Sequence, residues 1–149
     1  MPKIKRILVP IDFSEPSLAA LRFAIDLART LKARLEIVHV VEAATYAPMI
    51  GAAVDLDKLR EHQERTAQRG LARLAADLRR RRVRCRTALR IGAAPSTIVD
   101  LAKRSAADLT VMATEGRHGV GRLLLGRIAE RVARSAECPV LTVRARASP

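Results

Sequence analysis

The sequence has few aromatic residues, which make up 2% of its 149 positions and include no tryptophan. Its hydrophobic content of 49% suits a folded domain of this length. A buried core must therefore consist of Leu, Ile, Val and Ala side chains. Proteins that bind single-stranded nucleic acid or RNA stack the bases on aromatic side chains, so this composition argues against that class.

Cysteines and long apolar runs are also scarce. Cys85 and Cys138 are too few for a disulfide framework, and their spacing fits no metal site. No apolar run approaches the roughly 18 residues needed to cross a bilayer, and the opening MPKIKRILVPIDF has no signal-peptide core. We expect a soluble, cytoplasmic protein with no metal site and no membrane partner.

Positive charge is what the sequence has in excess. The formal net charge is +13, and only five of the 28 basic residues are lysines. Such a field attracts nucleic acid, anionic lipid or phosphorylated ligands. The charges are spread along the chain, which favours solvated helix faces over a nucleic-acid-binding tail. Binding of a polyanion by the run Arg79–Arg86 stays open as a weaker alternative, and specific nucleic-acid binding is not expected.

Hydrophobic periodicity predicts five strands alternating with four helices, in one domain over residues 1–149. Ser14 is predicted to cap the first helix, and Gly70 to weaken the second by up to ~1 kcal/mol relative to alanine. The alternation indicates an α/β fold, a doubly wound parallel sheet with helices on both faces. The strands are predicted at 7–11, 34–41, 83–89, 108–113 and 140–143, and the helices at 15–31, 55–80, 97–105 and 128–135.

Ligands of such folds bind beyond the carboxyl ends of the strands, where the winding direction switches. Three strand ends are predicted to meet there. They are Pro10–Asp12, Val40–Glu42, and Met112 with the segment that follows it. That segment, ATEGRHGVGRLLLGRIAERV, holds four glycines and leads into a helix, as phosphate-binding loops do.

The two common phosphate motifs do not fit this glycine-rich segment. Gly116 and Gly121 have Walker A spacing, but Arg122 and Leu123 replace the Lys and the Ser or Thr that the motif requires. The dinucleotide fingerprint fails as well, because its third glycine would fall at Leu124.

A different likeness covers roughly residues 4–144. ILVPIDFSEPSLAALRFAIDLA, the strand ending in HVV, DLTVMAT and GRLLLGRIAERVARSAECPVLTV together resemble the universal stress protein family. The resemblance implies five parallel strands in the order 3-2-1-4-5, of the adenine-nucleotide-hydrolase-like type. It also implies homodimers that pair their last strands, an apolar edge that would otherwise stay open. Here that strand consists of Val140, Leu141, Thr142 and Val143.

Family members that bind ATP carry Gly, two residues, Gly, nine residues, then Gly followed by Ser or Thr. The matching positions here are Ala113, Gly116, Gly126 and Arg127, so the first and last depart from the pattern. In the family, the residue that matches Asp12 lies beside the adenine, together with the end of strand two. The resemblance therefore implies ATP as the ligand, with magnesium only alongside it.

The departure at Arg127 leaves two interpretations open. A helix N-terminus already favours an anion, and arginine can clamp a phosphate with two hydrogen bonds. Alternatively, the side chain fills the phosphate space and leaves a ligand-free, dimeric interaction module. Ala113 costs little unless its φ is positive. Asp12 has an alternative role as a turn carboxylate that bonds Ser14 or a nearby N–H group.

No nucleophile and base converge on one loop, so no enzyme is predicted, and the missing hydroxyl at position 127 disfavours even slow ATP hydrolysis. His39 is interpreted as a satisfied core histidine. The predicted nucleotide-binding residues are Pro10, Ile11, Asp12, Val40, Val41, Met112, Ala113, Gly116, Arg117, His118, Gly119, Gly126, Arg127 and Ile128.

Overall fold

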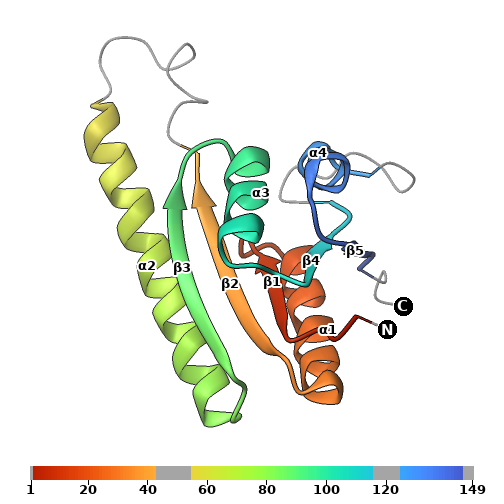
Figure 1. Ribbon diagram of the computed structural model, residues 1–149. Coiled ribbons are helices and arrows are strands. Elements are labelled where there is room, and N and C mark those ends of the chain that lie inside the picture. The colour runs from red at the N-terminus through yellow and green to blue at the C-terminus, as the bar shows by residue number, and fades with distance from the viewer. Residues whose placement is uncertain (1, 43–54, 116–124, 146–149) are drawn as a thin grey trace.

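The computed structural model describes residues 2–42, 55–115 and 125–145. Within them the chain forms a five-stranded parallel sheet in the order β3-β2-β1-β4-β5, which confirms the predicted fold (Figure 1). The third helix begins at Ala94 rather than at Thr97, because Pro95 fits its first turn. The strands are β1 (Arg6–Pro10), β2 (Arg34–Val41), β3 (Cys85–Ile91), β4 (Leu109–Ala113) and β5 (Val140–Val143), and the helices are α1 (Glu15–Leu31), α2 (Leu56–Arg80), α3 (Ala94–Arg104) and α4 (Arg127–Ser135).

Helices cover both faces of the sheet, with α1 and α2 on one face and α3 and α4 on the other (Figure 1). Because alternate strand residues point to opposite faces, Ile7 packs under α1 and α2 while Leu8 packs under α3 and α4. The buried hydrophobic residues are Ile, Leu, Val and Ala, with Met112 added. The core composition expected from the low aromatic content is therefore confirmed.

The winding direction reverses between β1, the central strand, and its neighbour β4. Their described ladder ends at Leu8, whereas β1 stays paired with β2 as far as Pro10. The N–H of Ile11 donates to the carbonyl of Val38 at 2.8 Å, so the backbone nitrogen of Pro10 is turned toward β4. Proline has no hydrogen to donate there. The backbones of β1 and β4 therefore stop pairing before β1 ends.

Asp108 fixes the opposite end of these two strands. Its Oδ2 accepts hydrogen bonds from the N–H groups of Lys5 at 2.8 Å and Arg6 at 2.9 Å. These hydrogen bonds, the one from Lys5 first, hold the pKa of the Asp108 carboxyl below its ordinary value. The contacts align the starts of β1 and β4, so both strands reach the same edge of the sheet.

The helix α2 lies against the sheet through a narrow apolar stripe that includes the buried Ala67, Leu71 and Leu78. The ring of Phe13, which follows β1, packs against Gly70 in the middle of this helix. A Cβ added to Gly70 would lie 2.9 Å from Phe13 Cζ, closer than side chains tolerate. In the described part of the chain, no helix is long and apolar enough to cross a bilayer.

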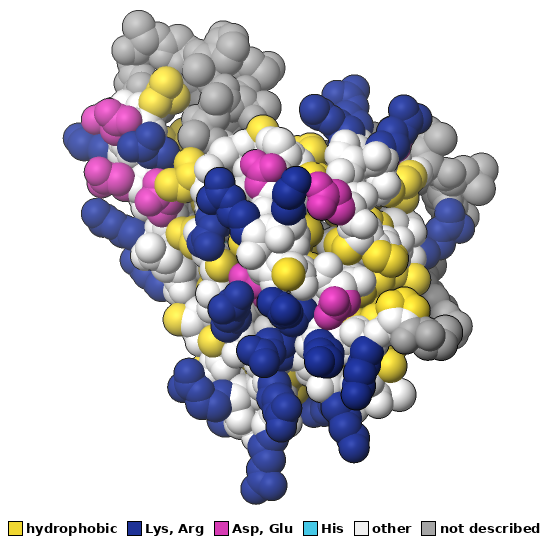
Figure 2. Space-filling view, viewed as in Figure 1, with side chains coloured by type: hydrophobic (Ala, Val, Ile, Leu, Met, Phe, Trp, Pro, Cys, Tyr) yellow, Lys and Arg dark blue, Asp and Glu magenta, His cyan; other side chains and the backbone are white. Residues whose placement is uncertain are grey.

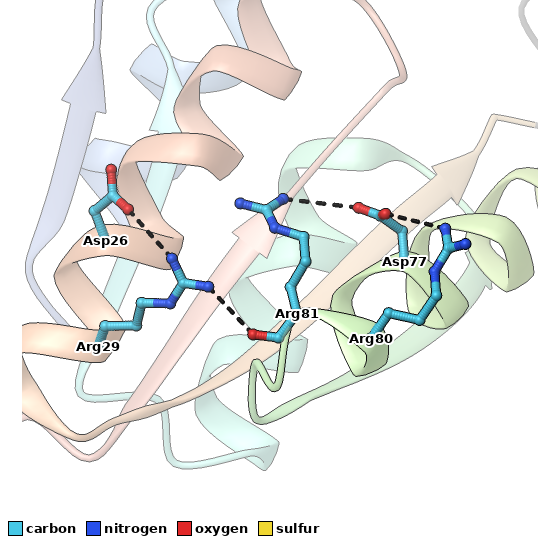
Figure 3. Close-up of polar contacts among 5 residues, drawn as sticks. All are labelled: Asp26, Arg29, Asp77, Arg80 and Arg81. Carbon is cyan, nitrogen blue, oxygen red and sulfur yellow. Dashed lines mark hydrogen bonds and ion pairs between the residues drawn. The ribbon is translucent and has the colours of Figure 1, made fainter.

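Arginines at the end of α2 are engaged within the chain (Figure 3). Arg80 Nη2 lies 3.2 Å from Asp77 Oδ1, and Arg81 Nη1 lies 3.7 Å from Asp77 Oδ2. Arg29 of α1 donates to the carbonyl of Arg81 at 3.3 Å and lies 3.9 Å from Asp26. Each exposed ion pair contributes little stability, and the hydrogen bond from Arg29 to Arg81 connects the ends of α1 and α2.

Candidate functional site

The described residues predicted to bind a ligand lie at the ends of β1, β2 and β4 and at the start of α4. Pro10 ends β1, Val41 ends β2 and Ala113 ends β4, while Arg127 begins α4. Because these parallel strands run the same way in one sheet, their carboxyl ends share one edge. Four predicted residues, Gly116, Arg117, His118 and Gly119, lie outside the described residues.

A backbone hydrogen bond holds α4 at this edge. The N–H of Gly126 donates to the carbonyl of Thr114 at 2.6 Å, directly after β4. Gly126 is the N-cap residue of α4 and supplies no side-chain cap. The N-cap residue therefore gives no side-chain hydrogen bond to the first N–H groups of α4, and the positive end of the helix dipole lies beside the end of β4.

The two departures from the ATP signature have different structural settings. Ala113 pairs with Val143 in the β4–β5 ladder, and its φ is not among the positive values of the chain. Its methyl group therefore causes no backbone strain. Arg127 is the first residue of α4, and its side chain is exposed. A cation at a helix N-terminus is unfavourable by itself, so this guanidinium is placed where an anion would stabilise it.

Asp12 shapes the turn from β1 to α1. Its Oδ1 accepts hydrogen bonds from the Ser14 N–H at 2.9 Å and from the Ser14 hydroxyl. Ser14 in turn caps α1, accepting from the N–H of Ser17 at 3.4 Å, as predicted. The turn role of Asp12 is thus confirmed, and its contact with a ligand stays a prediction.

His39 belongs to β2, is half-buried and lies next to the end of β1. Its Nδ1 lies 2.8 Å from the carbonyl oxygen of Ile11. A carbonyl oxygen only accepts, so Nδ1 carries the proton and donates. The imidazole also packs on the Phe13 ring, with the centroids 5.0 Å apart. The interpretation of His39 as a satisfied histidine is confirmed.

Phe13 is a residue of this edge that the sequence did not single out. It has a φ of 62°, in the left-handed region that aromatic residues rarely adopt. Its ring is held between His39 and Gly70. The signal available in the sequence was an aromatic residue, in a chain that has few, directly after Asp12 at the end of the first predicted strand.

The end of β2 is tied to α3 rather than to a local turn. The N–H of Gly92 donates to the carbonyl of Val41 at 3.0 Å, and Glu42 Oε1 accepts from the N–H of Ala94 at 3.0 Å. Gly92 has a φ of +152°, and a Cβ there would lie 2.8 Å from Thr97 Oγ1, so the turn requires glycine. Among the described residues, no three His, Cys, Asp or Glu side chains gather to hold a metal ion.

Known proteins share both the sequence pattern and the fold. The model of the universal stress protein family matches residues 3–144. A universal stress protein of Methanocaldococcus jannaschii is 33% identical over 142 residues, which cover 94% of this chain and 82% of that protein. One from Bacillus subtilis is 28% identical over 145 residues, covering 93% of this chain and 98% of the relative.

Solved structures of known proteins share the fold of this chain. UspA from Lactobacillus plantarum superposes with a TM-score of 0.83 at 25% identity, covering 97% of this chain and 100% of that one. A universal stress protein in complex with cAMP has a TM-score of 0.62 at 23% identity, with 96% and 98% covered. The Archaeoglobus fulgidus protein in complex with dAMP has a TM-score of 0.63 at 24% identity, with 95% and 98% covered. With the family match over nearly its whole length, this chain belongs to the universal stress protein family.

Proposed function

We propose that this chain is a stress-response protein that binds an adenine nucleotide or another phosphorylated ligand at the ends of β1, β2 and β4. One observation carries the proposal: the Gly126–Thr114 hydrogen bond of 2.6 Å sets the N-terminus of α4 at the end of β4. The first N–H groups of α4 and the residue Arg127 then both lie at this strand end. This combination favours a phosphate group.

The class of ligand is supported by relatives of the same fold. One was solved with cAMP and another with dAMP, both adenine nucleotides. In this chain we assign the adenine base to a position beside Asp12 and beside the end of β2, at Val40 and Val41. The phosphates would lie at Gly126 and Arg127. ATP, with magnesium alongside it, is the ligand we propose, and no residue is assigned a catalytic role.

The exposure of the Arg127 side chain favours a clamp, in which the guanidinium binds a phosphate, over a role in which it fills the phosphate space. In the competing interpretation the guanidinium fills the phosphate space and the protein is a ligand-free module. A side chain that filled this space would be buried against its neighbours, whereas Arg127 is exposed. An exposed guanidinium at a helix N-terminus remains available to a phosphate.

Nucleotide titration tests the proposal. Equilibrium dialysis of the full chain with ATP, with and without magnesium, is expected to show one saturable site per chain. Its Kd should lie below about 1 mM, which corresponds to roughly −4 kcal/mol. GTP and CTP are the matched controls and should bind more weakly, because they lack the adenine base. Failure of every adenine nucleotide to saturate at millimolar concentration would contradict the proposal.

We propose further that the protein acts as a homodimer joined through β5. This strand lies at the edge of the sheet, and its Leu141 is 36% exposed. An apolar edge strand leaves backbone groups and side chains ready to pair with a second copy. Pairing of two β5 strands would cover both.

Leu141→Lys is expected to weaken the dimer by at least about tenfold, because a lysine on an edge strand opposes pairing. Sedimentation equilibrium measures the dimer dissociation constant directly. Leu56→Lys is the control, since Leu56 is also exposed (43%) but lies at the start of α2. A monomeric parent chain, or equal weakening in both variants, would contradict an interface at β5.

A further inference from the structure

A second group of arginines lies on the α3 side of the sheet and extends from the amino ends of β1 and β2 along β3. Two adjoining hollows, of about 110 Å³ and 340 Å³, share Glu36, Arg86 and Ser105 in their linings. We call them together the arginine groove. Figure 2 shows Lys and Arg side chains gathered over the lower half of this face, with few acidic ones among them. The arginines that line the groove are Arg6, Arg34, Arg86, Arg90 and Arg104.

Strand register is what brings these arginines together. Arg6 of β1 lies beside Arg34 of β2, and Glu36 of β2 lies beside Arg86 of β3. Neighbouring residues of paired strands point to the same face, so Arg6 and Arg34 form a like-charged pair. Like charges directly opposite each other destabilise a sheet. An anion bound between them would remove that repulsion.

The groove carries more positive than negative charge. Five arginines face two carboxylates, Glu36 and Asp100, along its lining. Arg86 lies 3.3 Å from Glu36, and Arg6 donates to the Ser105 carbonyl at 2.9 Å. Among the described residues, Arg34 and Arg104 have no carboxylate within ion-pair distance.

Ser105 gives an independent sign that something binds here. It is only 9% exposed, and its Oγ is a buried side-chain atom without a hydrogen-bond partner in the described chain. Buried hydroxyl groups are nearly always satisfied, and an orphan destabilises the folded chain. Ser105 lies between the two hollows and lines both. Rotation of the Ser105 side chain toward the groove would let a ligand oxygen accept from this hydroxyl.

We infer that the arginine groove binds an oligophosphate, a ligand with two or three linked phosphate groups, with Ser105 Oγ donating to it. Most of the groove lies toward the amino ends of the strands, away from the proposed nucleotide site, and only Arg90 approaches that site, because it pairs with Val40 of β2. Arg86 and Arg90 are four residues apart in β3, or about 13 Å along the strand. A ligand with linked phosphates can contact arginines along this whole length at once. Planar guanidinium groups suit phosphate oxygens.

Calorimetric titration of the full chain with inorganic tripolyphosphate tests this site, at about 0.15 M salt to screen diffuse attraction. The titration uses the Arg127→Glu chain, in which the proposed nucleotide site is disabled, and we expect one ion bound per chain. The double variant Arg34→Gln/Arg104→Gln should bind at least about tenfold more weakly. Arg69→Gln/Arg73→Gln, on the exposed surface of α2, removes the same charge and should change the affinity less than about twofold.

Ser105→Ala tests the orphan hydroxyl. Its removal should weaken tripolyphosphate binding several-fold and raise the melting temperature by about 2–4 °C, because a buried unsatisfied group is lost. A merely structural serine would change the melting temperature without changing the affinity. Unchanged affinity in Ser105→Ala or in the groove double variant would overturn the inference. Equal losses of affinity in the two double variants would also overturn the inference. Such a result would indicate a diffuse positive field, which attracts any polyanion, including nucleic acid.

A competition experiment shows whether the phosphates bound in the groove belong to a nucleotide or to a free oligophosphate. ATP added to the Arg127→Glu chain, in which the other site is disabled, either displaces tripolyphosphate or does not. Displacement identifies the phosphates of a nucleotide as the ligand of the groove, and no displacement identifies a free oligophosphate. Either result supports the groove. Because tripolyphosphate lacks a base, its binding is independent of adenine selectivity, so failure of one site is distinguishable from failure of the other.

Discussion

Replacing Arg127 by glutamate is expected to weaken ATP binding by about 100-fold or more while leaving the chain folded. The change removes a charge-assisted hydrogen bond worth about 1.5–3 kcal/mol and adds repulsion between a carboxylate and the phosphates. A total near 3 kcal/mol corresponds to a factor of about 100. Glutamate in the first turn of a helix is itself favourable, so the free energy of unfolding should not fall. Equilibrium dialysis and urea unfolding measure the two quantities.

The control for this variant is Arg69→Glu, which makes the same change of charge at an exposed position of α2. Its effect on the affinity should be small, because exposed charges far from the site are screened by salt. Arg127→Ser then separates the two interpretations of the site. A clamp predicts an affinity about tenfold lower. A higher affinity would show that the arginine occupies the phosphate space and would contradict the clamp.

Gly70→Val is expected to destabilise the protein by about 2 kcal/mol, against the small gain that helix propensity predicts for replacing a glycine. The reason is the Phe13 ring, which would lie 2.9 Å from the first added carbon. This ring cannot move freely, because it packs on His39 with the centroids 5.0 Å apart. Urea unfolding measures the loss. Since Phe13 follows Asp12, the variant should also weaken nucleotide binding.

A double-mutant cycle tests the cause of that loss. In a Phe13→Ala background the space opposite Gly70 is open, so Gly70→Val should be neutral or slightly stabilising. The coupling free energy between the two positions should then be about 2 kcal/mol. Ala72→Val, at an exposed position of α2, controls for the intrinsic cost of valine in a helix. Additive effects at positions 13 and 70 would contradict a direct steric contact.

Most of the fold could be predicted because its strands are short apolar runs separated by helical periodicity. The start of α3 could not, because a glycine and a proline near it indicated a turn. The turn ends earlier than expected, at a helix whose Ala94 N–H is bonded by Glu42, 52 residues away in the sequence. No local pattern contains that contact. Gly70 is a similar case, since its cost to α2 is visible locally and its contact with Phe13 is not.

The two candidate sites differ in how far the sequence could reveal them. The turn role of Asp12 follows from a carboxylate two residues before a capping serine. The arginine groove depends on register: Arg6, Arg34 and Arg86 are far apart in the chain and meet only because three strands pair. The sequence could show an excess of arginine but not which arginines share a face.

The early end of pairing between β1 and β4 has a consequence for how such proteins diversify. Their backbones separate at Pro10, whose imide nitrogen faces β4 without a hydrogen. The gap in pairing at the switch point thus originates in main-chain geometry rather than in the side chains around it. We therefore expect that side chains at this edge can be exchanged without restoring the pairing, so that ligand preference can change while the sheet stays the same.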